Sequence, residues 1–217
     1  MYEGFEKDVY TRVIHLYGKD MQLNQANEEL AELIVAQNNI LWFCEKYNFP
    51  HNTLLKDIDS VIPDTAYKQF WPEPSEQIKT FYLEWMDERA DVEIVIEQME
   101  QIFNDSKNFE LLKEDTKKYK GASEPWWIFE LPKLCASVLK AIAKVKRVEF
   151  YGGNHEEEIT KLCVARVELY SHLQELYEIF EDKDLIQEIK KQKLQRLNSR
   201  MDQYEWNKLE KENESKN

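Results

Sequence analysis

Apolar residues recur at helical spacing along nearly the whole chain, from Phe5 to Met201, and no segment sustains the apolar–polar alternation of a strand. The stretch over 84–99 shows this most clearly, because its apolar side chains fall on one stripe: Met86, Ala90, Ile94 and Met99. Only five glycines and six prolines interrupt the 217 residues. The chain is therefore predicted to be an all-α protein.

Carboxylates crowd one face of the helix predicted over 84–99. Glu84, Glu88 and Asp91 follow one another at i, i+4 and i+7, so they share that face despite their like-charge repulsion. A solvated acidic face is the ordinary explanation of such a pattern, and a bound cation is the alternative.

A second acidic helix, predicted over 24–34, makes the cation more plausible, since Glu29 and Glu32 lie one turn apart on it. Two such helices packed side by side would bring four carboxylates together: Glu29, Glu32, Glu88 and Asp91. An all-oxygen site of this kind suits Mg²⁺ rather than zinc.

The segments around these carboxylates resemble the all-α nucleoside triphosphate pyrophosphohydrolases, the MazG-like and dimeric-dUTPase group. The resemblance rests on Glu-x-x-Glu at 29–32, within Glu-Glu-Leu-Ala-Glu-Leu, and on Glu-x-x-Asp at 88–91, within Glu-Arg-Ala-Asp-Val-Glu-Ile. It continues before the first motif at 18–24 and after the second at 97–103. A MazG-like four-helix-bundle core is the fold that this resemblance implies.

The resemblance also implies an activity, the hydrolysis of a nucleoside triphosphate, preferably a deoxynucleotide, to the monophosphate and pyrophosphate. Mg²⁺, or Mn²⁺ in its place, would be the cofactor. The implied metal ligands and catalytic groups are the four motif carboxylates: Glu29, Glu32, Glu88 and Asp91. Glu32 is an alternative general base, and the sequence does not separate base from ligand.

Two groups of polar residues are candidates for contact with the substrate. Lys19, Gln22 and Asn24 come just before the first motif, where polar residues at a helix entry are an equally good explanation. The last predicted helix, from Leu185 to about Trp206, interleaves basic residues with its apolar ones: Lys190, Lys191, Lys193, Arg196 and Arg200. Packing with surface ion pairs is the common role of such residues, and contact with a triphosphate is the alternative.

The second part of the chain repeats the first in three pairs of short segments: 28–33 with 129–134, 88–93 with 163–168, and 102–105 with 179–182. This alignment needs two additional residues between Glu168 and Phe180. It predicts a tandem pseudo-dimer, or else a homodimer of the chain, with three parts: a half carrying both motifs over 1–120, a degenerate half over 121–201, and a polar tail over 202–217.

Both halves carry further expectations. In the first, 55 residues separate Glu32 from Glu88, more than is usual in the family, so an insertion of short helices and turns is predicted over about 41–82. In the second, the residues aligned with the four carboxylates are Glu130, Lys133, Cys163 and Arg166. The second half is therefore not expected to hold the same metal, although Arg166 could clamp a phosphate across the interface between the halves.

Charge and cysteine usage narrow the choice of partners. The formal net charge of −13 opposes binding to a nucleic-acid backbone, whereas Mg²⁺ can sit between an acidic pocket and a free triphosphate. The three cysteines stand in apolar surroundings and are predicted to be buried free thiols. The chain begins without a signal pattern and has no apolar run that approaches a membrane span, so a cytoplasmic protein without a membrane partner is expected. A catalytically inactive nucleotide-binding or protein-interaction module on the same fold is the competing hypothesis.

Overall fold

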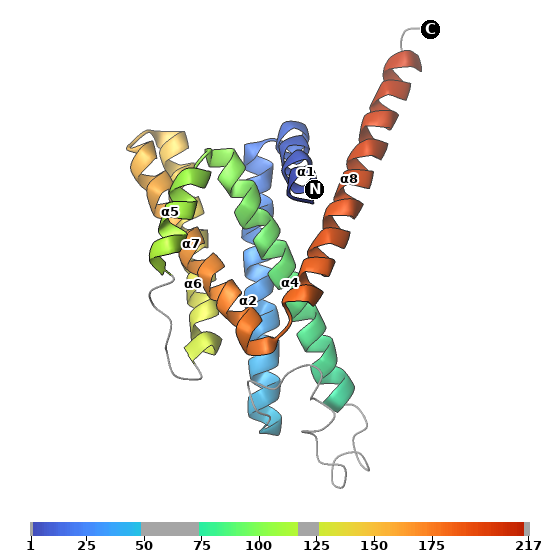
Figure 1. Ribbon diagram of the computed structural model, residues 1–217. Coiled ribbons are helices and arrows are strands. Elements are labelled where there is room, and N and C mark those ends of the chain that lie inside the picture. Colours follow the sequence, from blue (N-terminus) through green and yellow to red (C-terminus); the bar gives the residue numbers. More distant parts are fainter. Residues whose placement is uncertain (1, 49–73, 117–125, 215–217) are drawn as a thin grey trace.

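The computed structural model describes residues 2–48, 74–116 and 126–214. Within these ranges the chain forms helices and no strand, which confirms the predicted all-α helical bundle (Figure 1). The helices are α1 (Tyr2–Tyr17), α2 (Lys19–Tyr47), α4 (Pro74–Phe103), α5 (Ser106–Thr116), α6 (Trp126–Tyr151), α7 (His155–Phe180) and α8 (Lys183–Glu214). None of them is long and apolar enough to cross a membrane.

The two helices that carry the motifs are longer than predicted. α2 begins directly after Gly18, whose φ of 80° ends α1. Residues 41–47 continue α2, and residues 74–82 are the first turns of α4. The segment predicted to hold short helices and turns, 41–82, thus belongs at both ends to long helices. Its part over 49–73 lies outside the described residues.

Four helices form the centre of the bundle. α2 packs along α4, α6 packs along α7, and α2 also contacts α6. One apolar cluster runs through all four, with members such as Leu30, Trp85, Val138 and Leu169. The three cysteines are buried and free, as predicted.

α1 and α8 cover the outer side of α4 around a second apolar cluster that includes Val13, Ile94 and Leu194. Figure 1 shows α8 crossing α4 and running on beyond the bundle toward the C-terminus. Residues 202–214, the described part of the predicted polar tail, continue α8. Arg12 of α1 forms ion pairs with this part of α8, from its Nη2 to Oδ1 of Asp202 (2.7 Å) and to Oε2 of Glu205 (3.0 Å).

α4 and α7 end in the same way. Each is followed by a residue in the left-handed conformation, Asn104 (φ 52°) or Glu181 (φ 53°). The next residue is a buried aspartate that starts the following helix: the backbone oxygen of Asp105 accepts from Phe109 N at 2.9 Å, and that of Asp182 accepts from Ile186 N at 3.0 Å.

Two buried ion pairs join each of these aspartates to an arginine of the other helix. Arg89 of α4 donates to Asp182 after α7 at 2.6 Å, and Arg166 of α7 donates to Asp105 after α4. Arg166 follows Arg89 by 77 residues, and Asp182 follows Asp105 by the same 77. The two helices therefore match without a gap.

This continuous match corrects the predicted alignment by two residues. Arg166 is the counterpart of Arg89, not of Asp91. The residues 77 positions after Glu88 and Asp91 are Ala165 and Glu168.

Candidate functional site

Three of the four motif carboxylates converge where α2 packs along α4. Glu29 of α2 and Glu88 and Asp91 of α4 each offer an oxygen, and these oxygens lie within 4.8 Å of one another. Glu32 is exposed and stands outside this group. The spacing on the two helices therefore brings together three of the predicted ligands, and we call Glu29, Glu88 and Asp91 the carboxylate triad.

Burial and mutual repulsion make the triad hard to ionise. Burial, followed by the charge of Asp91, raises the pKa of Glu29 to about 7. Burial and then the charge of Glu32 likewise raise the pKa of Glu88 to about 7, and burial raises the pKa of Asp91. Oε2 of Glu88 is buried without a hydrogen-bond partner among the described residues. The triad therefore has unsatisfied acceptor capacity that a cation can meet.

Lys193 of α8 is the nearest counter-charge to the triad. Its Nζ donates to Oδ2 of Asp87 at 2.6 Å and to Oδ2 of Asp91, and its side chain is only 13% exposed. Burial acts to lower the pKa of Lys193, but the hydrogen bonds to Asp87 and Asp91 outweigh burial and raise it. Lys193 is therefore a charged ammonium held against the edge of the triad.

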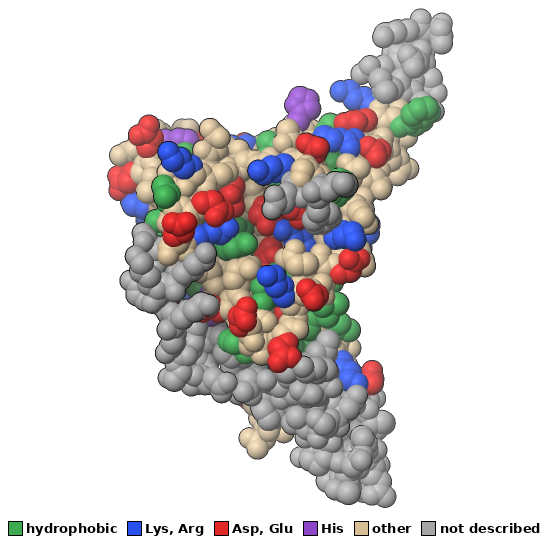
Figure 2. All heavy atoms as spheres, in the orientation of Figure 1, with side chains coloured by type: hydrophobic (Ala, Val, Ile, Leu, Met, Phe, Trp, Pro, Cys, Tyr) green, Lys and Arg blue, Asp and Glu red, His purple; other side chains and the backbone are tan. Residues whose placement is uncertain are grey.

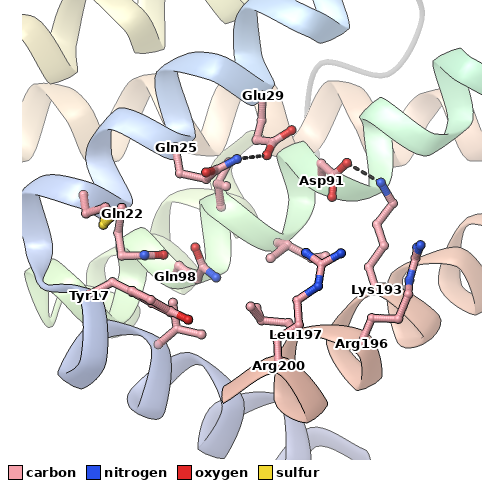
Figure 3. A pocket seen from close by; sticks show the side chains of 14 residues that line it. Tyr17, Gln22, Gln25, Glu29, Asp91, Gln98, Lys193, Arg196, Leu197 and Arg200 are labelled. Carbon is pink, nitrogen blue, oxygen red and sulfur yellow. Dashed lines mark hydrogen bonds and ion pairs between the residues drawn. The ribbon is translucent and has the colours of Figure 1, made fainter. Parts of the chain in front are cut away.

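A cavity of about 430 Å³ opens beside the triad between α1, α2, α4 and α8 (Figure 3). Glu29 and Asp91 line one side of it. α8 lines another side with three basic residues at i, i+3 and i+7: Lys193, Arg196 and Arg200. Acidic and basic groups thus line a single cavity.

The part of the cavity away from the charged groups is lined by amides and a phenol. Figure 3 shows Gln22, Gln98 and Tyr17 near one another there. Gln22 is 7% and Gln98 is 3% exposed, and Oε1 of Gln98 has no hydrogen-bond partner within the described part of the chain. Closer to the triad, Gln25 donates to Glu29. This end offers uncharged donors and acceptors.

Of the predicted substrate-binding residues before the first motif, only Gln22 lines the cavity. Lys19 pairs with Glu149 of α6 and lies 4.7 Å from the ring centroid of Phe103. Asn24 accepts a hydrogen bond from Lys146 of α6 at 2.6 Å. Lys19 and Asn24 therefore serve the contact between α2 and α6.

Arg166, the fourth predicted substrate contact, lies in the core and does not line the cavity. Its side chain is fully buried and bound to Asp105, and its guanidinium lies 5.9 Å and 5.4 Å from the ring centroids of Phe103 and Phe109. Arg166 is therefore not placed to clamp a phosphate in this structure.

The second half has no counterpart of the triad among the residues that the structure describes. Glu130 is paired with Lys133 at 2.7 Å on the surface, and Cys163 is buried. Glu168, the counterpart of Asp91, is exposed. Within the described residues the carboxylate cluster lies in the first half, and the residues at the matching positions differ from those in the predicted alignment.

Sequence reasoning gave no firm role to the basic residues of α8, nor to Tyr17, Gln25 and Gln98. The available signal was the one-face spacing of Lys193, Arg196 and Arg200, which would have separated them from Lys190 and Lys191. Lys190 is in fact buried against Glu97 at 2.6 Å, and Lys191 pairs with Glu188 on the surface.

The donor set fits a hard divalent cation. Three carboxylate oxygens could supply some of the ligands of such an ion, and Mg²⁺ commonly takes its remaining ligands from water or substrate phosphate. On the face drawn in Figure 2, the described acidic and basic side chains are interspersed and form no continuous basic surface. Comparison of the chain with models of known families, with curated proteins and with solved structures gives no match.

Proposed function

We propose that the protein is a Mg²⁺-dependent nucleoside triphosphate pyrophosphohydrolase that converts a (d)NTP and water to the (d)NMP and pyrophosphate. The observation that carries this proposal is a carboxylate triad of which two members, Glu29 and Asp91, line the same cavity as the basic residues of α8. Carboxylates suit a divalent cation, while ammonium and guanidinium groups suit phosphate oxygens. A nucleotide triphosphate complexed with a metal presents both of these partners.

The residues divide the work of the reaction. The triad would hold the ion, which supplies charge neutralisation and a more acidic water when bound. Arg196 and Arg200, which line the cavity, would neutralise the phosphates that leave as pyrophosphate. A carboxylate oxygen of the triad that is not bound to the ion would accept a proton from the attacking water. The oxygen of that water bonds to the α-phosphorus as the bond to the bridging oxygen breaks.

The rest of the cavity suits a nucleoside. Its volume of about 430 Å³ falls within the range of small-molecule sites. Gln22 and Gln98 present amide groups that can meet the edge of a base, and Tyr17 adds an aromatic ring. Because the second half completes the four-helix core within the same chain, we propose that the protein acts as a monomeric pseudo-dimer in the cytoplasm.

A second candidate function is nucleotide binding without turnover. The contact of Lys193 with Asp91 favours it, because the ammonium already supplies part of the charge that a metal would bring. The same fold would then serve as a sensor or an interaction module.

Pyrophosphate release from a panel of dNTPs, with and without Mg²⁺, separates the two functions. We expect release that requires the metal and is lost in Glu88→Gln. Glu84→Gln is the matched control, because Glu84 is exposed one turn earlier on α4. Nucleotide binding without release by the wild-type protein would refute hydrolysis and support the second candidate.

A further inference from the structure

Lys193 lies where α8 meets the acidic face of α4. Its ammonium contacts Asp91, a member of the triad, and Asp87, which lies one turn earlier on the same helix. The side chain is 13% exposed, so these contacts are sheltered from water. Sheltered ion pairs are screened less than surface pairs.

The contact with Asp91 competes with metal coordination. Lys193 binds Oδ2 of Asp91, and a divalent ion held by the triad would bring two positive charges next to the same carboxylate. An ammonium and a divalent cation repel each other at such a distance. The ammonium or the ion can each neutralise the charge of Asp91. Simultaneous contact of both with this carboxylate is unfavourable because the two cations repel each other.

From this geometry we infer that Lys193 is an internal counter-cation of the triad, which leaves Asp91 when the metal binds and then faces the phosphates. This inference rests on the proposed metal site and adds a positioning role for a residue on α8. In the metal-free protein Lys193 keeps Asp91 in place at the triad and offsets its repulsion.

The cavity provides a destination for the released ammonium. Lys193 lines it together with Arg196 and Arg200, which make no ion pair within the described residues. Phosphate oxygens entering between them would give Lys193 a new anionic partner. Metal and triphosphate should then bind with positive coupling, since each removes an obstacle to the other.

The test is a titration of the nucleotide-free protein with Mn²⁺, following the free ion by electron paramagnetic resonance. Lys193→Met removes the competing charge and should tighten Mn²⁺ binding by roughly fivefold to a thousandfold, the range that one unit charge at about 4 Å gives between bulk water and a protein surface. Lys193→Arg keeps the charge and should bind Mn²⁺ much as the wild-type protein does. A purely structural role would instead leave the affinity unchanged or weaken it.

Arg196→Met is the matched control, because it removes one positive charge from the same cavity without breaking a contact with the triad. We expect it to tighten Mn²⁺ binding clearly less than Lys193→Met. Equal tightening in both variants, or none in Lys193→Met, would overturn the inference. If Lys193→Met fails to fold by circular dichroism, Lys193→Gln carries the same test.

The outcome is separable from that of the proposed hydrolysis. Tighter Mn²⁺ binding by Lys193→Met, with no pyrophosphate release by the wild-type protein, would support the counter-cation and refute turnover. Pyrophosphate release by the wild-type protein, with unchanged Mn²⁺ affinity in Lys193→Met, would refute the counter-cation alone. Absence of Mn²⁺ binding in both proteins would refute the metal site and the inference together.

Discussion

The two central helix pairs, α2–α4 and α6–α7, share one arrangement of buried ion pairs but differ in their carboxylates. α4 and α7 each place a buried arginine 16 residues before a buried aspartate, and each arginine pairs with the aspartate of the other helix. α4 also carries Glu88 and Asp91, which meet Glu29 of α2. On α7 the matching positions hold a buried alanine and an exposed glutamate.

The comparison of the two helix pairs indicates that helix packing does not need the carboxylate triad. Among their described side chains, α6 and α7 pack against one another without such a cluster, so this packing does not require one. Converging carboxylates repel one another and lose hydration, which opposes folding. The α2–α4 pair carries this destabilising cluster, and the described part of the similar α6–α7 pair does not. A bound ligand explains this contrast, which supports the proposed metal site.

The largest expected effect tests the shared arrangement of buried ion pairs. Arg89→Met and Arg166→Met should each lower the free energy of unfolding by about 3–5 kcal/mol, because each leaves a buried aspartate without its partner. Urea unfolding followed by circular dichroism measures both. In the double variant Arg89→Met/Asp182→Asn part of the loss should be recovered. A large loss of unfolding free energy in one arginine variant and almost none in the other would show that the two ion pairs are not equivalent.

The next effect tests the difference between the halves. Asp91→Asn should reduce pyrophosphate release by on the order of a hundred- to a thousandfold, since it removes a charged ligand from the triad. Glu168→Gln changes the matching residue of α7 and should leave release nearly unchanged, as should Glu130→Gln on the surface of α6. Comparable damage from Glu168→Gln would show that both halves take part in catalysis.

Much of this arrangement follows from the sequence because it depends on local spacing. The i, i+3 interval places Glu88 and Asp91 on one face of a helix, and the apolar stripe beside them determines which face packs. Gly18, between α1 and α2, has a positive φ that few other residues adopt. These features need no knowledge of distant contacts.

The errors concern residues whose role depends on distant parts of the chain. The sequence around Arg166 does not indicate that its side chain is buried. Its burial is explained by its partner Asp105, which lies 61 positions away. An alignment shifted by two residues kept several apolar matches, so apolar pattern alone did not reveal the error. Lys193 lies over 100 residues from Asp87 and Asp91, and its role depends on how α8 crosses α4.

A smaller effect concerns metal and pH. With Mg²⁺ at ~100 times its Kd, the folded protein should gain about 2.7 kcal/mol, read as a rise in melting temperature. Glu88→Gln should abolish this rise. A rise in the variant equal to that of the wild-type protein would place the ion outside the triad.

The pH dependence follows from burial and repulsion, which raise the pKa of Glu29 and of Glu88 from 4.5 to about 7 in the folded protein. Without metal, their contribution to stability is therefore fully present below pH 4.5 and is lost as the pH rises through about 7. Since the metal binds the ionised carboxylates, the Mg²⁺-induced rise should be larger at pH 8 than at pH 6. Melts at the two pH values measure this, and a larger rise at pH 6 would contradict it.

The smallest effect concerns Gln98, whose counterpart in the continuous match between α4 and α7 is Glu175. Of these two residues only Gln98 lines the cavity, where its Oε1 lacks a partner within the described ranges. Gln98→Met keeps the size of the side chain and removes one hydrogen bond to a base, worth about 1 kcal/mol or roughly fivefold in kcat/KM. The loss should fall on the preferred dNTP and so flatten the preference among bases. Arg200→Met, the control at the charged end, should lower kcat/KM for all dNTPs alike, and a uniform loss in Gln98→Met would show that Gln98 does not contact the base.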